Sequence, residues 1–125
     1  MRIIDDRMFH VKPIIILVFL LGFIFACQSS KAGRFIVAES KEYDASLFRQ
    51  NCAICHGTEG NGKTLQDGTV VPSLRSGEFK FKTEDEIYKQ ISEGGNGMTP
   101  FRNQLSDREI RILATLVHDK LRHPQ

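Results

Sequence analysis

The chain has 125 residues and a formal net charge of +2, and 41% of its residues are hydrophobic. This length suits one domain around one core and leaves no room for a second domain of useful size. From residue 27 onward, 14 Lys and Arg stand against 13 Asp and Glu. Because these charges are balanced and interspersed, they form no basic stripe for a phosphate backbone, which argues against nucleic acid as a partner.

The amino-terminal segment carries basic residues before an uncharged apolar run from Ile14 to Ala26. This run is shorter than the about 20 residues of a membrane-spanning helix and fits the roughly 7–15 residues of the apolar part of a signal peptide. We therefore expect residues 1–26 to be an export signal that is cleaved before Cys27. Residues 27–40 would then form a polar tether, with 35–37 able to dock on the domain, and residues 41–125 the folded domain.

Residues 24–27, with the sequence IFAC, resemble the lipobox of bacterial lipoproteins, although Phe25 is bulkier than that motif usually has. The resemblance predicts that Cys27 is lipidated and holds the domain to a membrane on its periplasmic or extracytoplasmic side. Two alternatives stay open. Residues 30–32 (SKA) could serve as an ordinary cleavage site that releases a soluble protein, or the uncleaved run could act as a short anchor. Each alternative exports the domain.

Helical signals occur in three segments, and no segment gives a clear strand signal. Residues 43–51 contain good helix formers and lead into a cysteine motif. Residues 83–86 (TEDE) match a capping box, and the apolar face that follows ends at Gly94. Residues 106–109 (SDRE) match a second box. The apolar stripe behind it consists of Ile110, Leu113, Ala114, Val117 and Leu121.

Residues 51–57 (NCAICHG) contain the Cys-x-x-Cys-His pattern of covalent haem attachment. Positions three apart lie on one side of a helical turn, so Cys52 and Cys55 can both bond the vinyl groups of one haem as thioethers. The imidazole of His56 can then supply an axial ligand to the iron. The motif predicts one covalently bound haem c.

Two other uses of paired cysteines compete with haem attachment. A zinc site would need more ligands, and His118 and His123 have a spacing that zinc sites use. These histidines fall inside and just after the last predicted helix, without a zinc-finger pattern. A thioredoxin-like redox pair would begin a helix after a strand, and the sequence shows no alternation of strand and helix.

Residues 43–121 resemble class I c-type cytochromes of the small bacterial type in the order and spacing of their parts. The parts are a first helix, the haem motif, a proline loop, a further helix, a methionine loop and a last helix. The resemblance implies an all-α cytochrome c fold, with three to five helices wrapped around one covalently bound haem. It also implies that Met98 is the second axial ligand opposite His56. Met98 is the only methionine after the signal segment and lies in the glycine-rich loop 94–101; His118 is the alternative ligand.

The same resemblance implies roles for residues around the haem. Phe48 matches the aromatic residue that packs where the first and last helices cross. The carbonyl of Pro72 matches the acceptor of a hydrogen bond from His56, which would fix the imidazole. Asp44 stands where many members have glycine, so the crossing is wider here or Asp44 caps the first helix. Because the chain has no tryptophan, other donors must hold the haem propionates. The candidates are Tyr88, Arg75 and Arg102.

Two filled axial positions leave the iron no open site, so the resemblance implies a single-electron carrier in an exported electron-transfer chain rather than an enzyme. Its partners would be redox proteins, and it would be a monomer. Two alternatives remain. One is a haem sensor or peroxidase-like protein in which Met98 dissociates. The other is a permanent cytochrome subunit of an oxidase or dehydrogenase complex.

Overall fold

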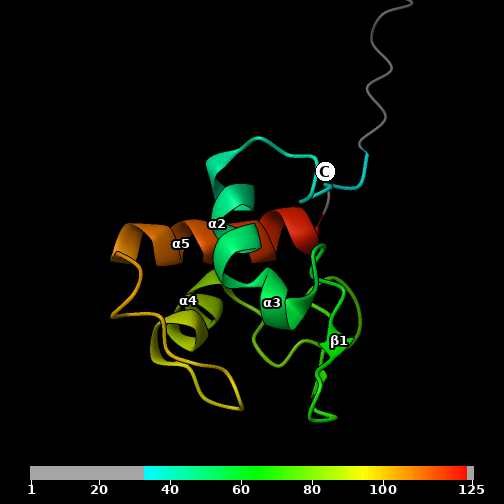
Figure 1. Cartoon of the computed structure of the whole chain (residues 1–125). Coiled ribbons are helices and arrows are strands. Elements are labelled where there is room, and N and C mark those ends of the chain that lie inside the picture. Colours follow the sequence, from blue (N-terminus) through cyan, green and yellow to red (C-terminus); the bar gives the residue numbers. More distant parts are fainter. Residues whose placement is uncertain (1–32, 124–125) are drawn as a thin grey trace, which may run out of the picture. The chain divides into compact units, whose positions relative to one another are not determined.

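The structure is a computed structural model that describes residues 33–123 (Figure 1). The predicted signal segment, Cys27 and the first part of the predicted tether lie outside the described residues. The elements in chain order are α2 (Tyr43–Asn51), α3 (Ala53–His56), β1 (Lys63–Thr64), β2 (Val70–Val71), α4 (Glu84–Glu93), α5 (Asp107–Thr115) and the π-helix η1 (Leu116–Leu121). Within residues 33–123, no helix has the length and apolar character needed to cross a membrane. The predicted helical fold is confirmed.

Capping boxes start α4 and α5, as the sequence predicts. The Thr83 hydroxyl accepts from the backbone N–H of Glu86, whose carboxylate accepts from the N–H of Thr83 at 2.9 Å. Ser106 and Glu109 make the same reciprocal pair, with 2.8 Å from the Ser106 N–H to the Glu109 carboxylate. Each box satisfies backbone donors that a helix start leaves without partners. At the other end of α4, Gly94 is the C-cap.

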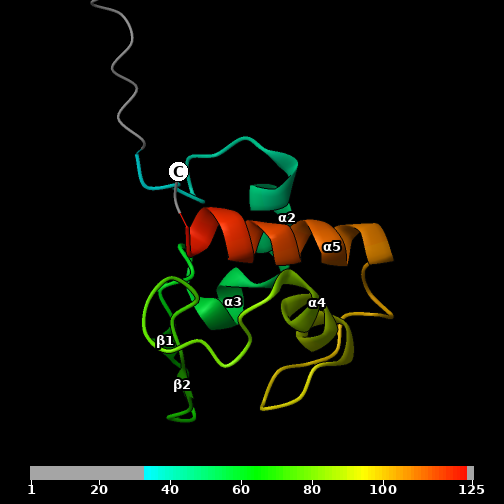
Figure 2. The same ribbon diagram turned by 180° about the vertical axis from the view of Figure 1, so that it is seen from behind.

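The core forms where α2 crosses α5, and Figures 1 and 2 show the two helices lying across each other from opposite sides. Phe48 is fully buried there, as predicted, together with all five residues of the apolar stripe. Asp44 does not cap α2, whose N-cap is Glu42. The carboxylate of Asp44 instead pairs with Lys120 at 2.7 Å and is largely shielded from solvent. This pair ties the first helix to the end of the last one.

The last helix changes its pitch after Thr115, where α5 gives way to the π-helix η1. The predicted stripe continues through the change, because Leu116, Val117 and Leu121 are all buried. The sequence predicts one uninterrupted helix here. Hydrophobic periodicity does not separate six residues of π-helix from an α-helix, since both keep one face on the core.

A two-stranded antiparallel hairpin, which the sequence analysis did not predict, follows the haem motif. Lys63 pairs with Val71 and Thr64 with Val70. Each strand is only two residues long, so it shows no alternation of polar and apolar residues. In Figure 2 the hairpin projects on the side where η1 ends, away from the turn that connects α4 to α5.

Residues 34–40, called here the leading segment, pack on the domain. Val37 has no exposed surface and belongs to the core cluster, and Phe35 is half-buried against it. The guanidinium of Arg49 donates to the carbonyls of Val37 and Ser40, at 2.5 and 2.9 Å. The predicted docking of residues 35–37 is therefore present, and the packed part of the chain begins before residue 41, the boundary drawn from the sequence.

The methionine loop makes a tight turn directly after α4. Gly95 and Met98 exchange two backbone hydrogen bonds, of 2.8 and 3.0 Å. Asn96 and Gly97 between them have positive φ angles of 53° and 84°, the backbone that a type I′ turn requires. Gly94 also has a positive φ of 72°, and a side chain there would lie 2.6 Å from the carbonyl oxygen of Met98. The loop can close only because residue 94 is glycine.

Replacing Phe48 by alanine should lower the free energy of unfolding by about 3–5 kcal/mol, because it leaves a cavity at the α2–α5 crossing. Urea unfolding of the full chain, followed by circular dichroism, measures the change. Val70→Ala removes methyl groups from a side chain that is 73% exposed and should change stability little. Equal losses for the two variants would show that Phe48 does not organise the core.

Gly94→Ala should destabilise the domain more than Gly97→Ala. Both substitutions carry the about 1–2 kcal/mol of a left-handed residue with a side chain. Only position 94 adds a collision, because a side chain at Gly97 would meet no atom within 4 Å. Thermal unfolding of the two variants compares these effects. If they are equally stable, the backbone at Gly94 is not as crowded as described.

Candidate functional site

The cysteine motif forms the end of α2 and the short helix α3. The N–H groups of Cys55 and His56 both donate to the carbonyl of Cys52, at 3.1 and 2.9 Å. These bonds wind the motif into a helical turn, so the two thiols and the imidazole follow one another around it. Cys52 is half-buried against the core, whereas Cys55 is exposed, and neither forms a disulfide. The turn can present both sulfurs to one flat cofactor.

Burial sets the protonation of the motif. It raises the pKa of the Cys52 thiol to about 12, with the charge of a Cys55 thiolate as a smaller cause. This burial favours the neutral thiol of Cys52 over the thiolate. Burial also lowers the pKa of His56. A neutral imidazole at neutral pH is the form that ligates a metal.

The loop after His56 folds back on the motif through glycines. The N–H of Gly62 donates to the carbonyl of His56 at 2.9 Å. A side chain on Gly62 would lie 2.4 Å from the carbonyl oxygen of Val71 and 2.8 Å from the carbonyl carbon of Pro72. The proline loop and the loop after His56 therefore touch backbone to backbone.

The predicted hydrogen bond between His56 and Pro72 is absent. Nδ1 of His56 is buried and has no hydrogen-bond partner within residues 33–123, and Pro72 itself is exposed. The prediction was wrong in this detail. The backbone at Val71 and Pro72 packs closely on Gly62. A buried nitrogen without a partner is rare in folded proteins and marks a ring whose surroundings the protein alone does not complete.

Met98 is half-buried against the same hydrophobic cluster as Cys52. The side-chain amide of Gln90, in α4, donates to the carbonyl of Gly95 at 2.9 Å and lies 3.8 Å from the sulfur of Met98. Asn96, at the tip of the turn, accepts a hydrogen bond from Lys80 at 2.8 Å. The loop is thus tied at its base and at its tip, with the thioether of Met98 between.

His118 and His123, the other candidate ligands, have contacts near the end of the described chain. Nδ1 of His118 is 2.5 Å from a carboxylate oxygen of Asp119, and its ring meets that of His123 at 5.6 Å. In the part of the chain that the structure describes, no three His, Cys, Asp or Glu side chains are grouped to hold a metal ion. The structure gives the zinc alternative no support.

Of the suggested propionate donors, Arg75 and Tyr88 already have partners. Arg75 pairs with Glu59 at 3.1 Å, and its side chain is only 4% exposed. The hydroxyl of Tyr88 donates to Asp107 at 3.3 Å. Arg102 is exposed. The sequence analysis missed Gln90 and Glu59, because a single amide or carboxylate in a helix or loop carries no local pattern that would distinguish it from a surface residue.

Comparisons with known proteins show the family of the chain. Residues 44–117 match the model of the family described as "Cytochrome C oxidase, cbb3-type, subunit III". The match spans most of the region between the start of α2 and η1, including the cysteine motif and the methionine loop.

Several curated relatives are cytochromes. Cytochrome c6 from Parathermosynechococcus lividus is 32% identical over 76 residues, which are 61% of this chain and 85% of that protein. Cytochrome c6 from Gracilaria tenuistipitata var. liui is 32% identical over 59% of this chain and 67% of that protein. The cytochrome bc1 complex cytochrome c subunit of Corynebacterium diphtheriae is 36% identical over 53% of this chain, but only over 20% of its own length.

Among solved structures, the c-type cytochrome KustC0563 matches with a TM-score of 0.51 and 33% identity. The match covers 58% of this chain and 90% of that one. The cofactor of such a domain is haem c, and the motif supplies the two thiols of Cys52 and Cys55 for its attachment. The chain therefore belongs to the c-type cytochrome family, as a haem c domain of the electron-carrier type.

Proposed function

We propose that this protein passes single electrons between redox proteins through a haem c whose axial ligands are His56 and Met98. The observation that carries the proposal is that two hydrogen-bonded turns pack on the same hydrophobic core. One is the helical turn that contains His56, and the other is the glycine-rich turn that contains Met98. Bound haem supplies reversible exchange of one electron at its iron. The residues of the chain would hold this haem and supply both of its protein ligands.

His56 suits the first axial position because burial lowers its pKa and keeps its ring neutral. Met98 suits the second because its loop is tied to Gln90 on one side and packed on the core on the other. Pro72 enters the proposal as backbone support for the loop after His56 rather than as a hydrogen-bond acceptor. With both positions filled by protein, oxygen or peroxide finds no open coordination site, so we propose a carrier and not an enzyme.

We also propose that the domain is exported and held to a membrane through a lipid on Cys27, facing the periplasmic or extracytoplasmic side. Residues 1–27 support this through their apolar run and the sequence IFAC. The side chains after residue 26 carry one net positive charge, and two haem propionates would bring the total to about −1. Association of this proposed monomer with partners should therefore depend only modestly on ionic strength.

A second candidate is a permanent cytochrome subunit of a larger complex. Two similarities favour it: the matching family is described as subunit III of a cbb3-type cytochrome c oxidase, and one relative is a cytochrome c subunit of a cytochrome bc1 complex. Size-exclusion chromatography of protein purified from membranes in mild detergent separates the two functions. A haem-loaded monomer supports the free carrier, and co-elution with oxidase or reductase subunits supports the second candidate.

Met98→Ala should abolish the sulfur-to-iron charge-transfer band of the oxidised protein and let carbon monoxide bind the reduced protein, because the sixth coordination position becomes open. Absorption spectra of both oxidation states measure this. His118→Ala is the matched control and should leave the band intact. An unchanged band in Met98→Ala would remove Met98 from the site. Ready binding of carbon monoxide to the unmodified protein would favour a haem sensor or peroxidase-like protein.

Cys27→Ser should move the protein from the detergent-rich to the aqueous phase in a detergent partition of cell membranes, because no acyl chain can be attached. Ser29→Ala should partition like the unmodified protein. Retention of the Cys27→Ser variant with membranes would show that the lipid proposal is wrong and that the apolar run itself acts as the anchor.

A further inference from the structure

The ion pair of Glu59 and Arg75 is the most buried one among the described residues. The Arg75 side chain is 4% exposed and that of Glu59 24%, whereas the pair of Arg111 and Asp85 has side chains 49% and 87% exposed. Arg75 Nη2 donates to the Glu59 carboxylate at 3.1 Å, and its Nε donates to the Glu59 carbonyl. One guanidinium thus holds both the backbone and the side chain of the same residue.

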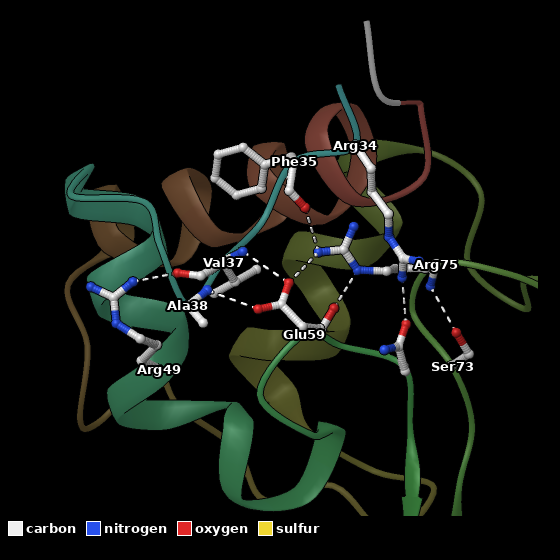
Figure 3. A network of polar contacts seen from close by, with 9 residues as sticks. Arg34, Phe35, Val37, Ala38, Arg49, Glu59, Ser73 and Arg75 are labelled. Carbon is white, nitrogen blue, oxygen red and sulfur yellow. Dashed lines mark hydrogen bonds and ion pairs between the residues drawn. The ribbon is translucent and has the colours of Figure 1, made fainter. Parts of the chain in front are cut away.

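The pair joins three segments that are far apart in the sequence, as Figure 3 shows. Glu59 lies three residues after His56, and Arg75 three residues after Pro72. From the leading segment, the N–H groups of Val37 and Ala38 donate to the two carboxylate oxygens of Glu59, at 2.9 and 2.8 Å. The carbonyl of Phe35 accepts from Arg75 at 2.8 Å.

The polar atoms of Glu59 and Arg75 are both engaged in hydrogen bonds with the surrounding chain. The two oxygens of Glu59 receive two backbone donors and the guanidinium, and Arg75 has acceptors for both its Nε and Nη2. Placing two charges out of water is unfavourable unless each is hydrogen-bonded, and here both are. Removal of either charge would leave the other buried without its counter-charge beside the loop that follows His56.

We infer that Glu59 and Arg75 are a positioning pair for the haem. They hold the loop after His56 against the proline loop, and the leading segment is bonded to both residues of the pair. Chain that precedes the first helix therefore belongs to the haem site. The redox readout of this inference rests on the proposed function, since it treats the bound haem as the group that changes charge.

The charges of the pair give it a measurable effect on the haem beyond packing. Oxidation adds one positive charge at the iron, so a nearby positive charge opposes oxidation and a negative charge favours it. Glu59→Gln leaves Arg75 uncompensated and should raise the reduction potential. Arg75→Gln leaves Glu59 uncompensated and should lower it. General loosening would admit water to the haem in both variants and shift both potentials in the same direction.

The test is a spectroelectrochemical titration of the haem-loaded full chain and these two variants. At the midpoint potential of the unmodified protein, the ratio of ferrous to ferric protein should rise several-fold in Glu59→Gln and fall several-fold in Arg75→Gln. Arg111→Gln, which breaks an exposed pair, is the matched control and should leave the ratio unchanged. Shifts of both variants in one direction, or shifts no larger than that of the control, would overturn the inference.

Limited trypsin digestion supplies a readout that does not depend on the haem potential. Loss of the pair should free the leading segment, so cleavage after Lys41 should become several-fold faster in both variants and remain unchanged in Arg111→Gln. Glu59→Gln keeps one side-chain acceptor for the backbone donors and should still fold. If Arg75→Gln does not fold, the cleavage rate of Glu59→Gln alone tests whether the pair holds the leading segment. Unchanged cleavage in Glu59→Gln would overturn the role of the leading segment.

The two readouts separate this inference from the proposed ligation. If the unmodified protein lacks the sulfur-to-iron band, the assignment of Met98 fails, while opposite shifts in the two variants still support the pair. If the band is present and the shifts are parallel, the ligation stands and the pair is only structural.

Discussion

The crossing of α2 and α5 at Phe48 is the contact on which the arrangement of the site depends. The cysteine motif continues directly from the end of α2, and the methionine loop returns from α4 to α5. Whatever fixes the two helices against each other therefore also fixes the turn of His56 relative to the turn of Met98. A fully buried aromatic ring makes this crossing rigid, because close-packed interiors do not deform continuously.

Rigidity is useful for electron transfer. A carrier that changes its ligand positions between oxidation states has to reorganise at every exchange, whereas supports fixed by the core change little. The methionine turn is held by few interactions. Two backbone hydrogen bonds and two residues with positive φ close it. Gln90 adds a side-chain bond from the adjacent helix. No large surface is needed to hold one sulfur atom in place.

Features with local causes could be predicted from the sequence. Ser106 and Thr83 begin helices because their side chains satisfy the nearby backbone, and Gly94 ends one because it accepts a positive φ. The spacing of Cys52, Cys55 and His56 was by itself enough to predict a covalently bound haem c. What the sequence missed depends on contacts between distant segments, such as the pairing of Glu59 with Arg75. The hydrogen bond predicted between His56 and Pro72 was wrong for a related reason, because it required two separate loops to meet in one arrangement that the local sequence does not specify.

If Cys27 carries the proposed lipid, docking of the leading segment limits how far the domain can move from the membrane. Were the chain free up to residue 41, 14 residues after Cys27 could extend about 50 Å. Because residues 34–40 are packed on the domain, the chain from Cys27 to Arg34 is what remains between the proposed lipid and the domain, and its greatest possible length is about 25 Å. Halving the radius would reduce the volume open to a lipid-anchored domain to about one eighth, which would raise its effective concentration near partners in the same membrane. If Cys27 carries the proposed lipid, the protein would work as a short-range relay rather than as a shuttle between distant complexes.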